Sequence, residues 1–304
     1  MNIGMNGTCY LCHLSKQIET ARAMCTDEQV TAFTRELMQA YLEAPEEASA
    51  PWFTPVAEGL LQKYFNAPKD RYQAEKEMSN RFVLERLDAI RDIARTAEDP
   101  VYAGLQLALL GNYLDFDALG ENVSFEQLEE ILRSSRENHV DDAAFASLRR
   151  DLEQGKQLLY VTDNAGEIGF DRIFAEEIHR KYPHISITFC VRGGATLNDA
   201  TREDAQLLGI PFPVIDNGTL VPGTRLDILG PEAKAAFAAA DVIISKGQGN
   251  VETLWGCGLN VYFAFLAKCQ RFQEVFRVPR LTPMLLRERQ KPPRKKEKKG
   301  LYRR

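Results

Sequence analysis

The pattern that most constrains the fold is an alternation of short apolar runs with helical segments, which begins after Gly155. Apolar strands that alternate with helices are typical of an α/β fold with a doubly wound, mostly parallel sheet. The expected strands are Leu158–Val161, Ile185–Val191, Phe212–Ile215, Val242–Ile244 and Val261–Phe265. The expected helices between and after them are Asp171–Tyr182, Ala200–Leu208, Glu232–Ala240 and Val251–Cys257.

The segment before Gly155 is predicted to be helical, with no run that resembles a strand. Thr26 is expected to cap a helix whose apolar residues recur at helical spacing, at Val30, Phe33, Leu37 and Tyr41. A capping-box pattern at Ser124 opens another helix, and residues 69–97 form a long, charged, periodic segment. The sequence therefore predicts an N-terminal helical subdomain (1–155), an α/β catalytic domain (156–286) and a basic, disordered tail (287–304).

Charge and hydropathy exclude several classes of function. The net charge is −5, although residues 287–304 contain ten Lys or Arg and two Glu. The mild overall charge argues against a specific nucleic-acid partner, while a weak anionic contact through the tail stays open. No signal peptide and no membrane-length apolar stretch is visible, so we expect a cytoplasmic protein without a membrane partner.

Polar residues follow the apolar runs, at the points where the expected strands end. In an open α/β sheet, ligands bind outside the carboxyl ends of the strands, so these residues are predicted to meet at one edge. Asp163, Asn164 and Asp199 offer oxygen ligands for a hard divalent cation such as Mg²⁺ or Mn²⁺. The histidines lie elsewhere in the sequence and are expected at surface or cap positions, which argues against a zinc-type site: His13, His139, His179 and His184.

The same edge carries residues suited to binding phosphate. Lys246 and Lys268 add positive charge, and Gly247 and Gly249 allow the backbone to approach a ligand closely. The turn before Glu167 leads into a helix whose first N–H groups could face an anion. A cation, two lysines and helix-start amides together describe a phosphate site.

Each of these residues also has a purely structural interpretation. Asp163 is a candidate helix N-cap, Asp199 a candidate turn residue or cap, and the lysines candidate solvated side chains. Glu167 either orients a water or a ligand, or favours the helix dipole as a first-turn acid. The concentration of these residues at one sheet edge favours the functional interpretation.

The cysteines do not form a disulfide framework. Cys9 and Cys12 have the spacing of a metal or redox pair, and Cys25 is a candidate third ligand for a second site. An ordinary pair of thiols at the start of a helix is an equally good interpretation.

Several motifs together resemble the damage-control phosphatase family, formerly a domain of unknown function. They are Thr162-Asp-Asn-Ala-Gly-Glu167, Leu197-Asn-Asp-Ala-Thr201, Val221-Pro-Gly-Thr224, Lys246-Gly-Gln-Gly-Asn-Val-Glu252 and Lys268-Cys269, with Gly111-Asn112-Tyr-Leu-Asp115 as a further motif. The chain is similar to the acidic-residue methyltransferase and to a pantothenate kinase-associated phosphatase domain. Cys9-Tyr-Leu-Cys12 resembles the mark of an archaeal and bacterial subfamily of unassigned substrate.

The resemblance implies Mn²⁺ or Ni²⁺, with Mg²⁺ as a further candidate, held by Asp163, Asn164 and Asp199. It implies that the substrate phosphate contacts Lys268 and the loop from Lys246 to Asn250, Gly247 and Gly249 included. The implied activity is removal of phosphate from damaged or surplus small metabolites. The walls of the substrate pocket are expected near Asn112 and Asp115, for which helix capping is the structural alternative.

The predicted mechanism is attack by a metal-activated water. A covalent aspartyl-phosphate fits less well, because Ala165 stands where the familiar aspartate phosphatases have a second Asp. The alternative function is a nucleotide-dependent methyltransferase or dehydrogenase. Glu252 replaces the third glycine of the fingerprint that such enzymes carry, and the motif does not follow the first strand. A non-enzymatic binding protein is the remaining alternative.

Overall fold

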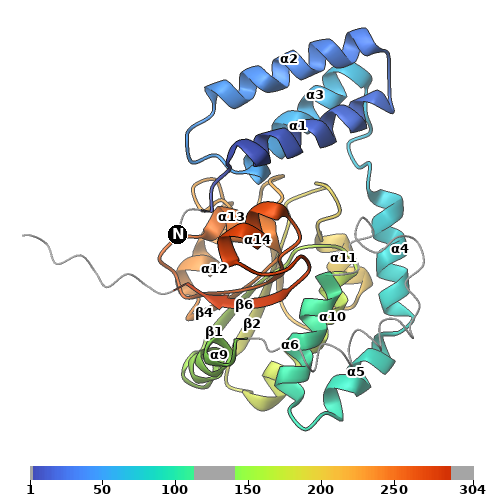
Figure 1. Ribbon diagram of the computed structural model, residues 1–304. Helices are drawn as coiled ribbons and strands as arrows, with labels where there is room; N and C mark the ends of the chain where they lie inside the picture. Colours follow the sequence, from blue (N-terminus) through green and yellow to red (C-terminus); the bar gives the residue numbers. More distant parts are fainter. Residues whose placement is uncertain (1–2, 113–140, 289–304) are drawn as a thin grey trace, which may run out of the picture.

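A computed structural model describes residues 3–112 and 141–288 (Figure 1). Its centre is a six-stranded sheet with the strand order β3-β2-β1-β4-β5-β6. All neighbours are parallel except β5 and β6. The strands are β1 (Gln157–Val161), β2 (Ser186–Val191), β3 (Val214–Asp216), β4 (Val242–Lys246), β5 (Val261–Leu266) and β6 (Pro283–Arg287). This arrangement confirms the predicted α/β class with a mostly parallel sheet.

Helices cover both faces of the sheet, and alternate strand residues enter two different cores. Leu158 and Tyr160 of β1 pack with the helices α4 (Gln73–Leu84), α5 (Leu87–Arg95), α6 (Pro100–Gly111), α9 (Asp142–Gln154) and α10 (Glu167–Lys181). Leu159 and Val161 pack on the other face with α12 (Pro231–Ala239), α13 (Gln248–Leu254) and α14 (Gln270–Phe276). The short helix α11 (Arg202–Leu207) follows β2. Both faces are buried, which explains the near-continuous apolar runs.

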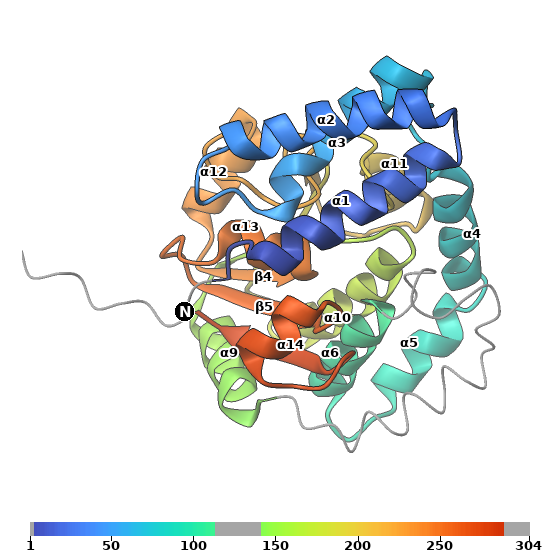
Figure 2. The same ribbon diagram turned by 45° about the horizontal axis from the view of Figure 1, so that its top comes forward.

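The first three helices have a core of their own. α1 (Gly7–Arg22), α2 (Asp27–Glu43) and α3 (Ala50–Phe65) pack around buried residues that include Phe33, Leu37 and Leu61. Both views show these helices as a separate layer, from which the chain continues into α4 (Figures 1 and 2). The later helices of the N-terminal half share the core of the sheet instead.

Three local features were not resolved by the sequence pattern. The charged, periodic segment 69–97 forms two helices, α4 and α5. Thr26 occupies the N-cap of α2, but its hydroxyl donates to the Gln29 side chain and caps no backbone N–H. The edge strand β6 was not predicted, because its five residues begin with Pro283, end with Arg287 and show no clear alternation.

Some predictions lie outside the described residues: those for Asp115, Ser124 and His139, and that of a disordered tail from 289 onward. The limits of the three predicted segments stay a prediction. Within residues 3–112 and 141–288, no helix has the length and apolar character needed to cross a membrane.

Candidate active site

The candidate site lies where the strand order reverses. From β1 the chain proceeds outward to β2 and β3, and then returns to place β4 on the other side of β1. The carboxyl ends of two such strands leave a crevice, since their connections run in opposite directions. Asp163 comes two residues after the end of β1, and Gly247 follows β4 directly. Predicted site residues therefore lie at the crevice between the carboxyl ends of β1 and β4.

A cleft of about 550 Å³ opens at this point, between the sheet edge and the N-terminal helices. Of the predicted site residues, those that line it are Asn112, Asp163, Asn164, Asp199, Gly249 and Lys268. The opposite wall comes from α1 and α3, through residues such as His13, Gln17 and Pro51. The α1–α3 layer therefore covers the carboxyl edge of the sheet, as the two ribbon views also show (Figures 1 and 2).

The loops after β1 and β2 are joined through their backbones. Asn164 and Asp199 form an isolated β-bridge. The Ala200 N–H donates to the Asp163 carbonyl at 2.7 Å, and the Ala165 N–H donates to the Asn198 carbonyl at 2.8 Å. These bonds bring Asp163, Asn164 and Asp199 to the same wall of the cleft, as a shared cation site would require.

Neither aspartate is a helix cap. The N-cap of α10 is Gly166, and the N-cap of α11 is Thr201, which forms a capping box with Asp204. The capping interpretations of Asp163 and Asp199 are therefore wrong, and both side chains are available for another role.

Asp199 is held by a buried guanidinium. Arg192 is 1% exposed, and its Nε donates to Oδ2 of Asp199. Its Nη2 donates to Oδ1 of Asn250 at 3.2 Å. Burial raises the pKa of Asp199, while Arg192 opposes that rise. Arg192 thus fixes one oxygen of the carboxylate and supports its ionised form.

Two amide groups join the carboxylates of Asp163 and Glu167. The Nδ2 of Asn164 donates to Oδ2 of Asp163 and to Oε2 of Glu167, both at 2.9 Å. The Nδ2 of Asn112 donates to the same two oxygens, at 3.1 Å and 2.7 Å. Burial raises the pKa of Asp163 well above its usual range, and the nearby charges of Glu167 and Asp199 raise it further. A cation beside these carboxylates would reverse that effect.

Lys246 does not reach the cleft, contrary to the prediction that it contacts substrate phosphate. It is fully buried, and its Nζ donates to Oε1 of Glu167 and Oδ1 of Asp171, both at 2.6 Å. The third proton goes to the Ala108 carbonyl at 2.7 Å. Burial alone would lower the pKa of Lys246, but Asp171 and Glu167 raise it above its ordinary value. All three donors of the ammonium are used, so the role of Lys246 is to hold Glu167 in place from within the protein.

Asn250 is likewise buried away from the cleft. Its Nδ2 donates to the Thr162 and Lys246 carbonyls, and its Oδ1 accepts from Thr224 and Arg192. Asn250 therefore does not make the predicted contact with substrate, and its side chain instead joins neighbouring loops by hydrogen bonds. Gly247 lies beneath the site with a φ of 77°, and a Cβ at this position would overlap the Asp163 carboxylate. Only glycine fits at this position.

The donor set fits a hard divalent cation. Asp163, Asn164 and Asp199 provide carboxylate and amide oxygens on one wall, and oxygen ligands are those that Mg²⁺ and Mn²⁺ prefer. The amide Oδ1 of Asn112 is buried without a hydrogen-bond partner in the part of the chain that the structure describes. An unsatisfied buried oxygen in the wall of the same cleft is the feature that a bound cation would explain.

A family model described as the damage-control phosphatase ARMT1-like domain matches residues 5–280. The chain belongs to this family. It is 31% identical to an uncharacterized protein of Methanocaldococcus jannaschii over 278 residues, which cover 88% of the chain and 90% of the relative. It is 35% identical to a damage-control phosphatase of Pyrococcus horikoshii over 181 residues, which cover 58% of the chain and 61% of that relative.

A further relative and a solved structure agree with this assignment. The chain is 31% identical to a damage-control phosphatase of Archaeoglobus fulgidus over 206 residues, 66% of the chain and 70% of the relative. The crystal structure of a DUF89 family protein from Pyrococcus horikoshii matches with a TM-score of 0.80 and 26% identity, covering 94% of the chain and 99% of the neighbour. The predicted family and a phosphatase role are therefore confirmed, and nothing supports the methyltransferase alternative.

The sequence did not identify several residues of this damage-control phosphatase site. His13 was expected at the surface or at a cap, but it lines the cleft, where its Nδ1 lies 2.5 Å from the Tyr41 hydroxyl and burial lowers its pKa to about 4. Arg192 and Asp171 were not identified as charge partners of the site. The signal for Arg192 was its position directly after β2, at the carboxyl edge of the sheet where Asp199 also lies.

Cys25 is not a third ligand beside Cys9 and Cys12. Cys9 and Cys12 lie near the start of α1, and Cys25 comes after the helix ends at Arg22. At a rise of 1.5 Å per residue, the helix alone separates them by about 15 Å. Among residues 3–112 and 141–288, no group of three or more His, Cys, Asp or Glu is placed to hold a metal. A site at the Cys9–Cys12 pair stays a prediction.

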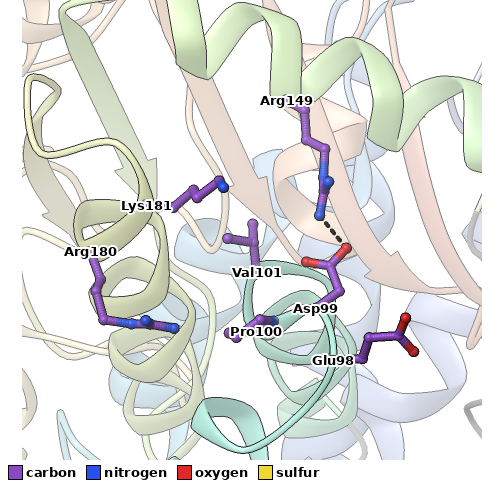
Figure 3. A pocket seen from close by; sticks show the side chains of 7 residues that line it. All are labelled: Glu98, Asp99, Pro100, Val101, Arg149, Arg180 and Lys181. Atoms are coloured by element: carbon purple, nitrogen blue, oxygen red, sulfur yellow. Dashed lines mark hydrogen bonds and ion pairs between the residues drawn. The ribbon is translucent and has the colours of Figure 1, made fainter.

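A second pocket, of about 450 Å³, lies at the opposite ends of α6 and α10 (Figure 3). Arg149, Arg180 and Lys181 line it together with Glu98 and Asp99, and Arg149 pairs with Asp99. α6 begins here and ends beside Asn112, while α10 ends here and begins at Glu167. The pocket contains none of the predicted site residues, so we do not assign the phosphatase chemistry to it.

Proposed function

We propose that this protein is a metal-dependent phosphomonoesterase for small phosphorylated metabolites, as damage-control chemistry requires. The observation that carries the proposal is the convergence of Asp163, Asn164 and Asp199 on one wall of the switch-point cleft. Family membership supports the phosphatase reaction. A cleft of about 550 Å³ has the size of a small-molecule site.

Asp163, Asn164 and Asp199 would hold Mn²⁺ or Ni²⁺, with Mg²⁺ as a further candidate. When bound, such a cation supplies Lewis-acid polarisation of the phosphoryl group and lowers the pKa of water. Lys268 lines the same cleft and would bring positive charge to the phosphoryl oxygens.

Glu167 is proposed as a positioning residue that orients ligands, and not as the group that orients water. Its side chain is fully buried, with Oε1 bonded to Lys246 and Oε2 bonded to Asn112 and Asn164. Because the side chain is fully buried and does not line the cleft, an attacking water in the cleft has no access to it. As a first-turn acid of α10, Glu167 also favours the helix dipole.

Hydrolysis of p-nitrophenyl phosphate tests the proposal, followed by a panel of phosphorylated metabolites. We expect turnover with Mn²⁺ or Ni²⁺, loss of turnover with a chelator, and recovery when the metal is restored. The diester bis-p-nitrophenyl phosphate is the control and should not be hydrolysed. Turnover that persists in the chelator, or no turnover on the whole panel with any of the three metals, would contradict the proposal.

A further inference from the structure

Asn112 carries an unusual oxygen. The residue is 1% exposed and lines the cleft, yet its amide Oδ1 is buried and accepts no hydrogen bond from residues 3–112 or 141–288. Leaving a buried carbonyl oxygen unpaired costs free energy, so native proteins rarely keep one without a bound ion, a water or a functional reason. This oxygen lies on the side chain that enters the site from the N-terminal half of the chain.

The orientation of the amide is fixed by charge. Its Nδ2 donates to Oδ2 of Asp163 at 3.1 Å and to Oε2 of Glu167 at 2.7 Å. Turning the amide over would place its carbonyl oxygen against two carboxylates, which repel it. The nitrogen is therefore held toward the acids, and the oxygen is directed away from them.

Neither acceptor is free to move away. Glu167 is bonded to the buried ammonium of Lys246 at 2.6 Å, and Asn164 donates to both carboxylates as well. The approach of Asn112 is equally constrained, because a Cβ at Gly111 would lie only 3.1 Å from Cγ of Glu167. The packing of α6 on α10 thus fixes the position of the Asn112 amide.

We propose that Asn112 is a fourth oxygen donor to the cation held by Asp163, Asn164 and Asp199. The inference rests on the cation site of the proposed function and replaces the substrate contact predicted for Asn112. Amide carbonyl oxygens are regular ligands of hard divalent cations. Four protein oxygens would leave positions on an octahedral ion for water and a phosphoryl oxygen.

Calorimetric titration of the full, metal-stripped chain with Mn²⁺, without substrate, tests the inference. We expect Asn112→Ala to bind Mn²⁺ at least about 10-fold more weakly than the wild type. Asn112→Asp restores an oxygen but not the N–H₂ group, and it should bind Mn²⁺ more tightly than Asn112→Ala. The matched control is Asn260→Ala, which also removes an amide whose Nδ2 donates two hydrogen bonds, to Asp151 and the Asp241 carbonyl, and whose Oδ1 in addition accepts two from Arg287. Asn260 precedes β5, at the other edge of the sheet, and its loss should leave Mn²⁺ affinity unchanged.

Two results would overturn the inference: Mn²⁺ affinity of Asn112→Ala within about two-fold of wild type, or weaker binding by Asn112→Asp than by Asn112→Ala. The second result would show that Asn112 serves only as a hydrogen-bond donor. If Asn112→Ala does not fold, a wild-type crystal with Mn²⁺ decides, since Oδ1 must lie about 2 Å from the ion. No substrate is present, so absence of phosphatase turnover leaves the inference standing. A wild-type chain that binds no Mn²⁺ would instead contradict the cation site itself.

Discussion

Replacing Asp163 by asparagine is expected to lower kcat/KM for a phosphate monoester by at least about 10³-fold. The substitution removes one negative charge from the proposed cation site while it keeps the size of the side chain. Metal-assisted charge stabilisation contributes several kcal/mol to such reactions, and about 1.4 kcal/mol corresponds to each factor of ten in rate. Steady-state kinetics at saturating Mn²⁺, together with Mn²⁺ titration of the variant, measures the effect.

The matched control is Asp88→Asn on α5, whose side chain is 95% exposed and pairs with Arg91. It removes the same charge far from the cleft and should retain wild-type kcat/KM. Wild-type activity in Asp163→Asn would contradict the assignment of this residue to the cation site.

Replacing Lys246 by methionine should reduce the free energy of unfolding by about 3–5 kcal/mol, because it leaves two buried carboxylates without a cation. Lys246, Glu167 and Asp171 are all fully buried, so solvent cannot compensate for the lost ammonium. Burial already raises the pKa of Asp171 to about 7, with Lys246 opposing the rise and Glu167 adding to it. Denaturant unfolding in the absence of metal measures the change.

The loss should also depend on pH, with a defined sign. Removing the ammonium raises the folded-state pKa of Asp171 further, and a raised folded-state pKa lowers stability as pH rises through it. The destabilisation should therefore be larger at pH 8 than at pH 6, where protonation relieves the repulsion.

Lys63→Met is the control, since that exposed ammonium pairs with Glu36 at the surface, and its loss should barely move the unfolding midpoint. An equally small effect for Lys246→Met would show that the buried pair is unimportant to the fold.

The sheet was predictable because its strands are buried on both faces. Runs such as Leu158–Val161 and Val261–Phe265 must then be continuously apolar, and the structure places strands at both. β6 lies at the edge of the sheet and is less completely buried, so its sequence is less clearly that of a strand. In the segment 69–97 the helical period continues across the break between α4 and α5, which hides the break from a periodicity argument.

The site was only partly predictable, for a different physical reason. Position after a strand places a residue at the sheet edge, and this suffices for Asp163 and Asp199. It does not tell whether the side chain turns toward the cleft or into the protein. Lys246 ends β4 and turns inward, because Glu167 and Asp171 of α10 offer it two carboxylates. These partners lie 79 and 75 residues away in sequence, and no local pattern reveals them.

We infer that oxygens from the loops after β1 and β2 hold one cation in the switch-point cleft. Anomalous scattering from crystals grown with Mn²⁺ tests it most directly. We expect a single strong peak in the cleft, about 2 Å from side-chain oxygens of Asp163, Asn164 and Asp199. A Mn²⁺ peak elsewhere in the molecule with none in this cleft would contradict it.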